Sequence, residues 1–194
     1  MRSSGIRQLI REMLLTEAAY TPEEAAEERI RFRAVRTRMG KGGWAVSAKH
    51  VDEWEAYGEI RISLPLGSGK CLGAYEVNQS IVGDDAPHGL GPLLYDIAME
   101  LTGPAGLMSD RLIVSGEARR VWKFYHDNRP DVDHEQMDSR PGTLTPDFED
   151  DDCNQSSSRK DGKDWKQSPL SKVYRKRGTP TIDKLRTLGI IEIV

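Results

Sequence analysis

The fold of this chain is decided by residues 71–103, which read CLGAYEVNQSIVGDDAPHGLGPLLYDIAMELTG. Residues 71–82 are typical of a strand, and the loop of residues 83–92 contains glycines and prolines that end it. From Leu93 onward apolar residues recur at helical spacing, and Gly103 ends that helix. The segment therefore predicts a strand, a glycine-rich loop and a helix in direct succession.

The loop before this helix has features that suit a phosphate group. Free backbone N–H groups converge at the start of a helix and can hold an anion. Gly89 and Gly91 have no side chains to block a close approach, and Pro92 favours the first helical turn although it has no N–H to donate. We expect the loop to accept a pyrophosphate, with an ordinary strand-to-helix turn as the alternative.

Two common nucleotide-binding motifs do not fit the sequence. No glycine stands three residues after Gly91, and the strands before the loop look antiparallel, which excludes the dinucleotide-binding motif. Residues 67–70, Gly-Ser-Gly-Lys, precede a strand instead of a helix, and Cys71 stands where a P-loop needs Ser or Thr. We interpret residues 67–70 as a hairpin loop.

Upstream of this segment the sequence predicts helices followed by strands. Apolar residues at helical spacing indicate an amphipathic helix within residues 6–14, either packed on the domain or docking a partner. Thr21 and Glu24 predict a capping box, with Pro22 between them, for a second helix that runs to about Glu28. Period-two alternation then predicts strands, the first with an arginine-rich face, at residues 30–34, 44–48 and 58–66.

Downstream, a short strand is expected at residues 107–109. Ser115 begins another helix, which ends before Pro130. Residues 131–164 show little periodicity and include the acid run of residues 147–152, so they are predicted to form a mobile acidic loop. Order is expected to return from residue 165, with a helix at 181–188 and a strand at 190–194.

These elements predict an α/β protein of the α+β type, with a mixed, mostly antiparallel central sheet and flanking helices. The expected organisation has four parts. They are N-terminal helices packed on the domain (1–28), a core (29–130), the acidic loop (131–164) and a C-terminal helix and strand that complete the domain (165–194).

Residues 57–128 resemble the GNAT superfamily of acyl-CoA-dependent N-acyltransferases. In that family a long strand runs into a Gln/Arg-x-x-Gly-x-Gly/Ala loop, followed by a helix, a strand and a last helix. The matching residues are Gly89-Leu90-Gly91 for the loop, residues 93–98 for the helix, residues 106–109 for the strand and residues 115–118 for the last helix start. Two departures are Ala86, at the place of the Gln or Arg, and Trp122, at the place of the usual tyrosine. The sequence also resembles, more weakly, GNAT-like proteins encoded by tailed phages.

The resemblance implies that acetyl-CoA is the acyl donor and that the acceptor is an amine on a small molecule or a protein. The residues it places around CoA are Val82, His88, Gly89, Leu90, Gly91 and Leu93. It also implies that a backbone N–H within residues 78–82 holds the oxyanion and that an acid protonates the leaving thiolate.

For the acid we name Tyr125, and for a base Glu76 or Asp110, acting directly or through water. The alternative for Tyr125 is that it packs in the core beside Trp122. The alternative for each carboxylate is a solvated or salt-bridged surface position.

Composition limits the other possibilities. The net charge of −3 gives no global attraction to nucleic acid or to an anionic membrane. Two cysteines are too few for a disulfide framework or a cysteine zinc site, and charged residues interrupt the early apolar run, which argues against export. The apolar runs are too short to span a membrane. We therefore expect a cytoplasmic protein, in the host cytoplasm if it is phage-encoded.

Two basic clusters leave a nucleic-acid partner open. One lies at residues 29–41 and the other at residues 172–177, and a solvated face balanced by nearby glutamates is the alternative for both. His126, His134 and Cys153 match no zinc spacing, so no metal is expected. Beside the acyltransferase, two further functions stay open: a non-catalytic GNAT-like binding or structural protein, possibly phage-associated, and a nucleic-acid-directed enzyme or binder.

Overall fold

The structure is a computed structural model, and it describes residues 20–38, 42–65, 73–136 and 167–194. Among these residues the chain first forms a short helix and four strands. These are α2 (Pro22–Glu27), β1 (Ile30–Thr37), β2 (Gly43–His50), β3 (Gly58–Ser63) and β4 (Tyr75–Val82). The elements that follow are α3 (Leu90–Thr102), η1 (Gly103–Ala105), β5 (Leu107–Met108), α4 (Gly116–Asn128), β6 (Val132–Gln136), η3 (Pro169–Ser171), β7 (Lys172–Lys176), α5 (Pro180–Thr187) and β8 (Ile191–Ile193).

The strands form one mixed sheet in the order β6-β7-β5-β4-β3-β2-β1-β8. Neighbours pair antiparallel except for β4 with β5 and β1 with β8, which are parallel. The class predicted from the sequence, a mostly antiparallel mixed sheet with flanking helices, is therefore confirmed. The order is compatible with a GNAT-like arrangement, in which the glycine-rich loop and α3 connect the two central parallel strands.

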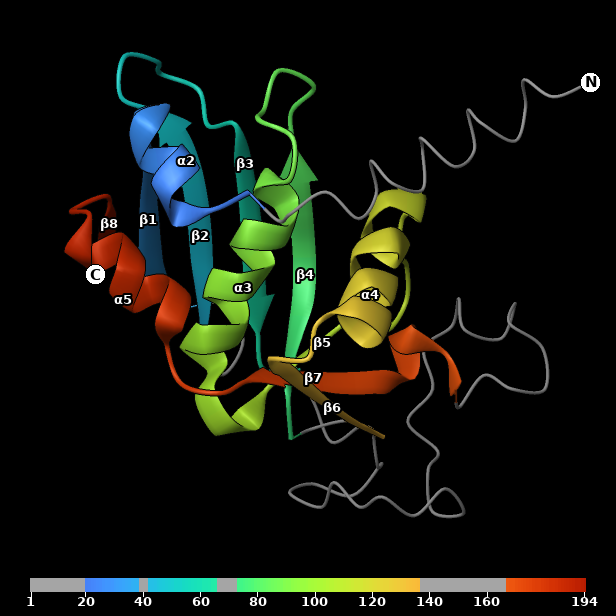
Figure 1. The fold of residues 1–194 in the computed structure, drawn as a ribbon. Coiled ribbons are helices and arrows are strands. Elements are labelled where there is room, and N and C mark those ends of the chain that lie inside the picture. Colours follow the sequence, from blue (N-terminus) through green and yellow to red (C-terminus); the bar gives the residue numbers. More distant parts are fainter. Residues whose placement is uncertain (1–19, 39–41, 66–72, 137–166) are drawn as a thin grey trace, which may run out of the picture.

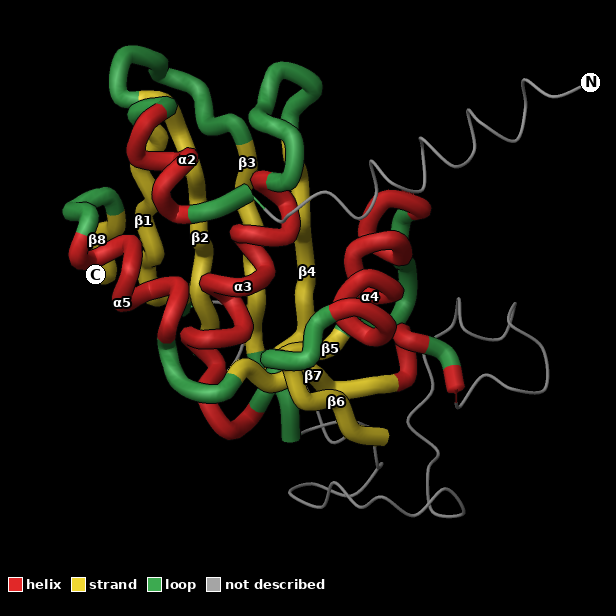
Figure 2. Tube along the Cα trace, viewed as in Figure 1, coloured by secondary structure: helices red, strands yellow, loops and turns green. Residues whose placement is uncertain are grey.

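The described helices cover one face of the sheet (Figure 1). Helix α3 packs across β2, β3 and β4, while α2 contacts β1 and α5 contacts β8 and α3. Helix α4 lies to the side of α3, against η3 and β6 (Figure 2). Alternation in β1 decides which side is buried, because Ile30, Phe32 and Ala34 face the helices and Arg31 and Arg33 face solvent.

Caps explain where several helices begin. The predicted capping box is present in α2, since the Thr21 hydroxyl accepts from the Glu24 N–H and Glu24 accepts from the Thr21 N–H. Ser115 caps α4 as expected, by accepting from the Ala118 N–H. The cap of α5 comes from another helix, because the Glu100 carboxylate accepts from the N–H groups of Thr181 and Ile182 at 2.9 and 2.7 Å.

The structure corrects the sequence interpretation after Pro130. Residues 132–136 are strand β6, so the expected loop cannot begin at residue 131. The second basic cluster is partly strand β7. Its Lys176 side chain is only 3% exposed, whereas its Arg177 side chain is solvent-exposed and pairs with Asp133, so the solvated-face alternative holds for Arg177 and not for Lys176. Helix α3 begins at Leu90, ahead of the expected Leu93. The helix of residues 6–14, the hairpin loop of residues 67–70 and the rest of the acidic loop lie outside the described residues.

Candidate functional site

Among the described residues, strand β4 pairs with β3 over most of its length on one edge and with β5 over only two residues on the other. It pairs with β3 from Glu76 to Val82, with a register shift that leaves Asn78 as an extra, bulged residue. Its pairing with β5 covers only Tyr75 and Glu76. Alternate residues of a strand present N–H and C=O to each edge, so the part of β4 after Glu76 offers backbone groups to the side that β5 leaves.

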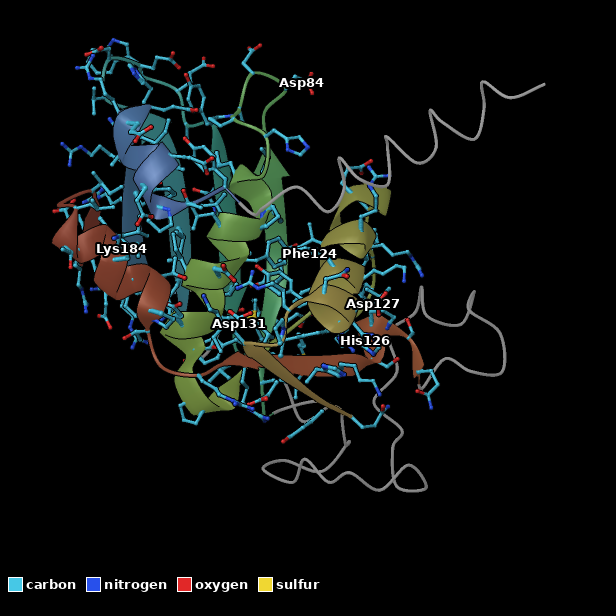
Figure 3. All side chains as sticks on the ribbon, viewed as in Figure 1. Asp84, Phe124, His126, Asp127, Asp131 and Lys184 are labelled. Carbon is cyan, nitrogen blue, oxygen red and sulfur yellow. The ribbon has the colours of Figure 1, made fainter. Side chains whose placement is uncertain are left out.

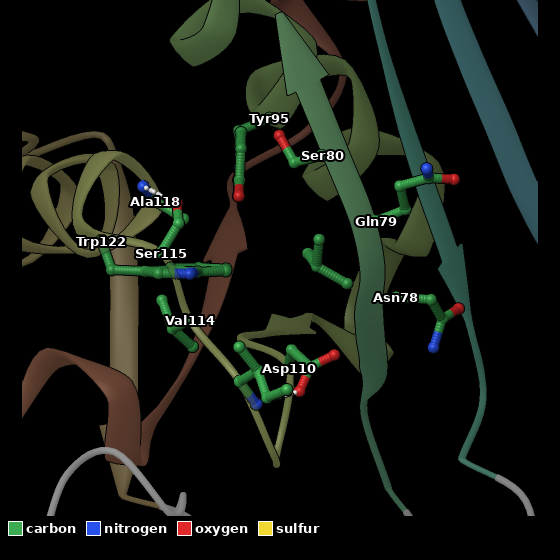
Figure 4. A pocket seen from close by; sticks show the side chains of 11 residues that line it. Asn78, Gln79, Ser80, Tyr95, Asp110, Val114, Ser115, Ala118 and Trp122 are labelled. Carbon is green, nitrogen blue, oxygen red and sulfur yellow. Dashed lines mark hydrogen bonds between the residues drawn. The ribbon is translucent and has the colours of Figure 1, made fainter.

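A cavity of about 370 Å³ occupies the space where β5 leaves β4. Its walls are β4, the β5–α4 loop and the start of α4, and its lining residues are Val77, Asn78, Gln79, Ser80, Tyr95, Asp110, Ile113, Val114, Ser115, Ala118 and Trp122. Tyr95 and Ser80 lie on one side of β4, and Asn78 and Gln79 on the other (Figure 4). The cavity therefore lies at an open sheet edge and is bordered by residues of both sheet faces.

Tyr95, from the second turn of α3, carries a phenol into this cavity (Figure 4). Ser80 lines the same cavity, and the Tyr95 ring lies edge-on to Trp122 with the centroids 5.2 Å apart. Trp122 is held in turn by Tyr174, at 4.9 Å between centroids. Burial raises the pKa of Tyr95, so the phenol keeps its proton at neutral pH.

Asp110, one of the predicted bases, also lines the cavity. Its Oδ1 accepts from the backbone N–H groups of Leu112 and Ile113 at 2.6 and 2.7 Å, which fixes the turn between β5 and α4. Within the described part of the chain, the other carboxylate oxygen has no hydrogen-bond donor. One oxygen is thus structural and the other is available to a ligand.

Glu76, the other predicted base, lies at the point where β4 and β5 still pair. Its Oε1 accepts from the Arg111 backbone N–H at 2.7 Å, and burial raises its pKa above the ordinary glutamate value. The Arg111 side chain is buried beside it, donates to the carbonyls of Ser109 and Leu170, and has its pKa lowered by burial to about 10. Glu76 does not line the cavity and instead anchors the loop that forms one wall.

Tyr125, the predicted acid, does not line the cavity either. It is fully buried, and its hydroxyl donates toward the Pro92 carbonyl at 2.7 Å and Asp96 Oδ1 at 2.9 Å. Asp96 belongs to a buried ionic network, because it pairs with Arg129 at 3.2 Å and with Lys176 at 3.5 Å. This placement gives no geometric support for proton transfer from Tyr125 and corresponds to the packing alternative.

The start of α3 lies against the end of β4. Gly89 is the N-cap with φ +86°, and none of the described side chains caps the helix. The Leu90 N–H donates to the Pro87 carbonyl and Pro92 has no N–H, so in this first turn the Gly91 N–H is left without a partner among the described residues. A Cβ on Gly89 would lie 2.9 Å from the Tyr20 backbone nitrogen, whereas one on Gly91 would make an ordinary 3.6 Å contact with Val82. The glycine at position 89 is thus required by the fold itself.

The remaining residues of the predicted CoA set differ in what they can contact. His88 is exposed and Val82 is 40% exposed, so their side chains are accessible to a ligand. Leu90 and Leu93 are buried in the core, so only their backbone could meet a ligand, and the Leu93 N–H already lies 3.4 Å from the Gly89 carbonyl. Asp84 lies in the exposed loop before α3 (Figure 3).

Sequence reasoning missed the residue that the geometry favours most. The sequence places Tyr95 only within a helix, although a tyrosine and an aspartate side by side in the mostly apolar run of residues 93–98 are a usable signal for polar groups directed at a special environment. Ser80 and Trp122 gave no such signal, because their meeting with Tyr95 depends on how α3 and α4 pack.

Comparison with family models, with curated protein sequences and with solved structures finds no match for this chain. Within the described residues no group of His, Cys, Asp and Glu side chains is arranged to hold a metal ion. No helix in the same ranges is both long and apolar enough to cross a lipid bilayer.

Proposed function

We propose that this chain is a GNAT-like acyltransferase that transfers an acetyl or other acyl group from CoA to an amine. The observation that carries the proposal is the cavity formed where the parallel strands β4 and β5 separate. An extended amide-containing arm, such as the pantetheine of CoA, can pair with the exposed backbone edge of β4 as an additional strand would. A volume of about 370 Å³ suits the reactive end of such a molecule.

The phosphate end of the donor would lie at the start of α3. The two residues from Ser80 to Val82 span about 7 Å of strand, and Val82 lies against Gly91 at the start of α3. The Gly91 N–H, which has no partner among the described residues, is suited to an anion there. The side chains of Val82 and His88 would border the phosphates, while Leu90 and Leu93 would support the loop from the core.

The reacting groups would meet between Tyr95 and Asp110. The acceptor amine attacks the thioester carbonyl carbon, and the oxyanion is stabilised by a β4 N–H in the bulged region after Val77. The C–S bond breaks, the leaving thiolate takes the proton of the Tyr95 phenol, and the new ammonium loses a proton to Asp110, directly or through water. Lining residues from both faces of β4 would let donor and acceptor approach from opposite sides.

Calorimetric titration of the full chain with acetyl-CoA tests the donor site. We expect saturable one-to-one binding that is lost in Ala118→Phe, which fills the cavity from α4, and retained in the matched Ala118→Ser. Gly91→Val should weaken binding at the other end, because its Cβ has room in the fold but crowds the approach to α3. Absence of binding by the wild-type chain at millimolar acetyl-CoA would overturn the proposal.

Catalysis is tested separately by release of free CoA thiol in the presence of a panel of amines. The second candidate function is a non-catalytic protein with the same fold. Asp84 and Asp85 favour it, because both are exposed on the loop that would approach the phosphates and would repel them. A folded chain that neither binds CoA nor releases thiol with any amine would select this candidate.

A further inference from the structure

The face of the sheet that the described helices do not cover carries a charged trench. Register places Arg31 opposite Lys49, Arg33 opposite Ser47, and Ser47 opposite Glu59, so these side chains share one face of β1, β2 and β3. The cavity over them has a volume of about 630 Å³, larger than the cavity beside β4. The lining includes small residues such as Ser47 and Ala56. It also includes the longer charged side chains of Arg31, Arg33 and Lys49.

Positive charge is in excess within this trench. Its two carboxylates are accounted for, since Glu192 pairs with Arg33 at 3.1 Å and Glu59 pairs with Arg61 at 2.5 Å. Arg31 donates to the Gly189 carbonyl, a neutral group. Within the described part of the chain no carboxylate pairs with Lys49. Arg31 and Lys49, which face each other across β1 and β2, therefore remain available to an anion.

Trp54 lies at the same trench and is 99% exposed. The loop that carries it is fixed by backbone bonds, from Val51 N–H to the Arg29 carbonyl at 3.1 Å and from Tyr57 N–H to the Ala48 carbonyl at 2.8 Å. A tryptophan normally hides most of its large apolar surface. The loop therefore holds the Trp54 indole in solvent at the same trench as Arg31 and Lys49. This combination indicates a partner that has both a flat ring and negative charge.

We propose that this trench, lined by Arg31, Arg33, Lys49 and Trp54, binds single-stranded nucleic acid. A base would stack on Trp54, and neighbouring phosphates would contact Arg31 and Lys49. A duplex keeps its bases stacked inside and cannot use the indole, while an acidic peptide would satisfy the cations but not Trp54. The proposal does not depend on acyl transfer. It concerns β1, β2, β3 and β8, which lie on the other side of β4 from β5 and the first cavity.

The test is fluorescence anisotropy of a short labelled oligothymidylate titrated with the full chain at several salt concentrations. We expect dissociation constants in the range of about 1–100 µM that weaken as salt rises. Trp54→Ala should weaken binding by about tenfold or more, whereas Trp54→Phe, which keeps a ring, should lose much less. Lys49→Gln should weaken binding and lower the dependence on salt by about one phosphate contact.

The matched control is Arg120→Gln, which removes another exposed cation, one that lies on α4 away from the trench. It should bind as the wild-type chain does, and circular dichroism should show that all variants keep the fold. The proposal is overturned if the wild-type chain does not bind the oligonucleotide at about 100 µM in low salt. It is equally overturned if Trp54→Ala binds normally, or if a polyglutamate peptide competes for Trp54-dependent binding as well as the oligonucleotide does.

Discussion

The two sides of β4 differ in how the sheet continues. Toward β3, β2 and β1 the strands pair over most of their length, with α3 packed on β3 and β2 and α2 packed on β1. Toward β5 and β7 the pairing lasts for two residues per strand, and the space beyond holds a cavity instead of a strand. In the first region the backbone N–H and C=O groups are paired between strands. In the second region the corresponding groups of β4 are available to a ligand.

A buried ionic network joins these two regions. Lys176 of β7 contacts Glu100 and Asp96 of α3 at 2.8 and 3.5 Å, and it donates to Thr181 of α5 at 2.6 Å. The Glu100 side chain is fully buried. The cavity can therefore stay open because the strands below it are connected to α3 by charge and hydrogen bonds.

The largest effect is expected from breaking this connection with Lys176→Met. The substitution leaves two carboxylates buried without their shared cation, which should cost about 3–5 kcal/mol in the free energy of unfolding. Urea denaturation measures it. The neighbouring Arg177→Met removes an exposed cation that pairs with Asp133 and should leave the midpoint almost unchanged. Equal midpoints for the two variants would show that the network does not join the regions.

The next effect concerns the open region alone. If Tyr95 gives its proton to the thiolate, Tyr95→Phe should lower kcat by about 10- to 100-fold. The ring and its contact with Trp122 are kept, so binding of acetyl-CoA should change little. Turnover is measured by release of CoA thiol once an amine acceptor is found. A Tyr95→Phe variant with wild-type kcat would remove Tyr95 from the proposed mechanism.

The same contrast explains what the sequence could predict. The regular region was predictable, because alternation in residues 30–34 and 58–66 marks strands whose partners are near in sequence. The capping box of Thr21 and Glu24 and the cap at Ser115 were predictable as well, since such caps are local. Strand β7 was not predictable, because a sequence rich in cations is typical of a solvent-exposed surface. Its two lysines are buried in the fold by partners in α3, α5 and β6, which are distant in sequence.

The candidate site was less predictable for a related reason. Asp110, predicted as a base, lines the cavity. Tyr125 and Tyr95 are alike in sequence, because each lies in a helix with apolar residues before it and a polar residue after it. Only the packing of α3 against α4 directs one phenol to the cavity and the other to Asp96. Local patterns cannot distinguish two such helical tyrosines.

Tyr125→Phe is therefore expected to change stability and not kcat, whereas Tyr95→Phe is expected to change kcat. It removes a buried donor from the Pro92 carbonyl and from Asp96, which should destabilise the fold by about 1–2 kcal/mol. Thermal and urea denaturation measure the change, and kcat of the folded variant should stay at the wild-type value. A large loss of kcat with unchanged stability would return the role of acid to Tyr125.

The smallest effect is expected at Glu76, where the two regions meet. Burial raises the pKa of Glu76 in the folded chain, so the folded state binds this proton more tightly than the unfolded state does. The resulting stability is present below the unfolded pKa and is lost as the pH rises through the folded pKa. Glu76→Gln removes this loss, because the amide oxygen still accepts from the Arg111 N–H but never ionises.

We therefore expect the variant to match the wild-type chain at acidic pH and to be slightly more stable at neutral pH, as measured by melting temperature across a pH series. A variant that is less stable at neutral pH would show that the ionised carboxylate stabilises the junction through Arg111, and that its charge, more than its hydrogen bond, holds the cavity wall in place.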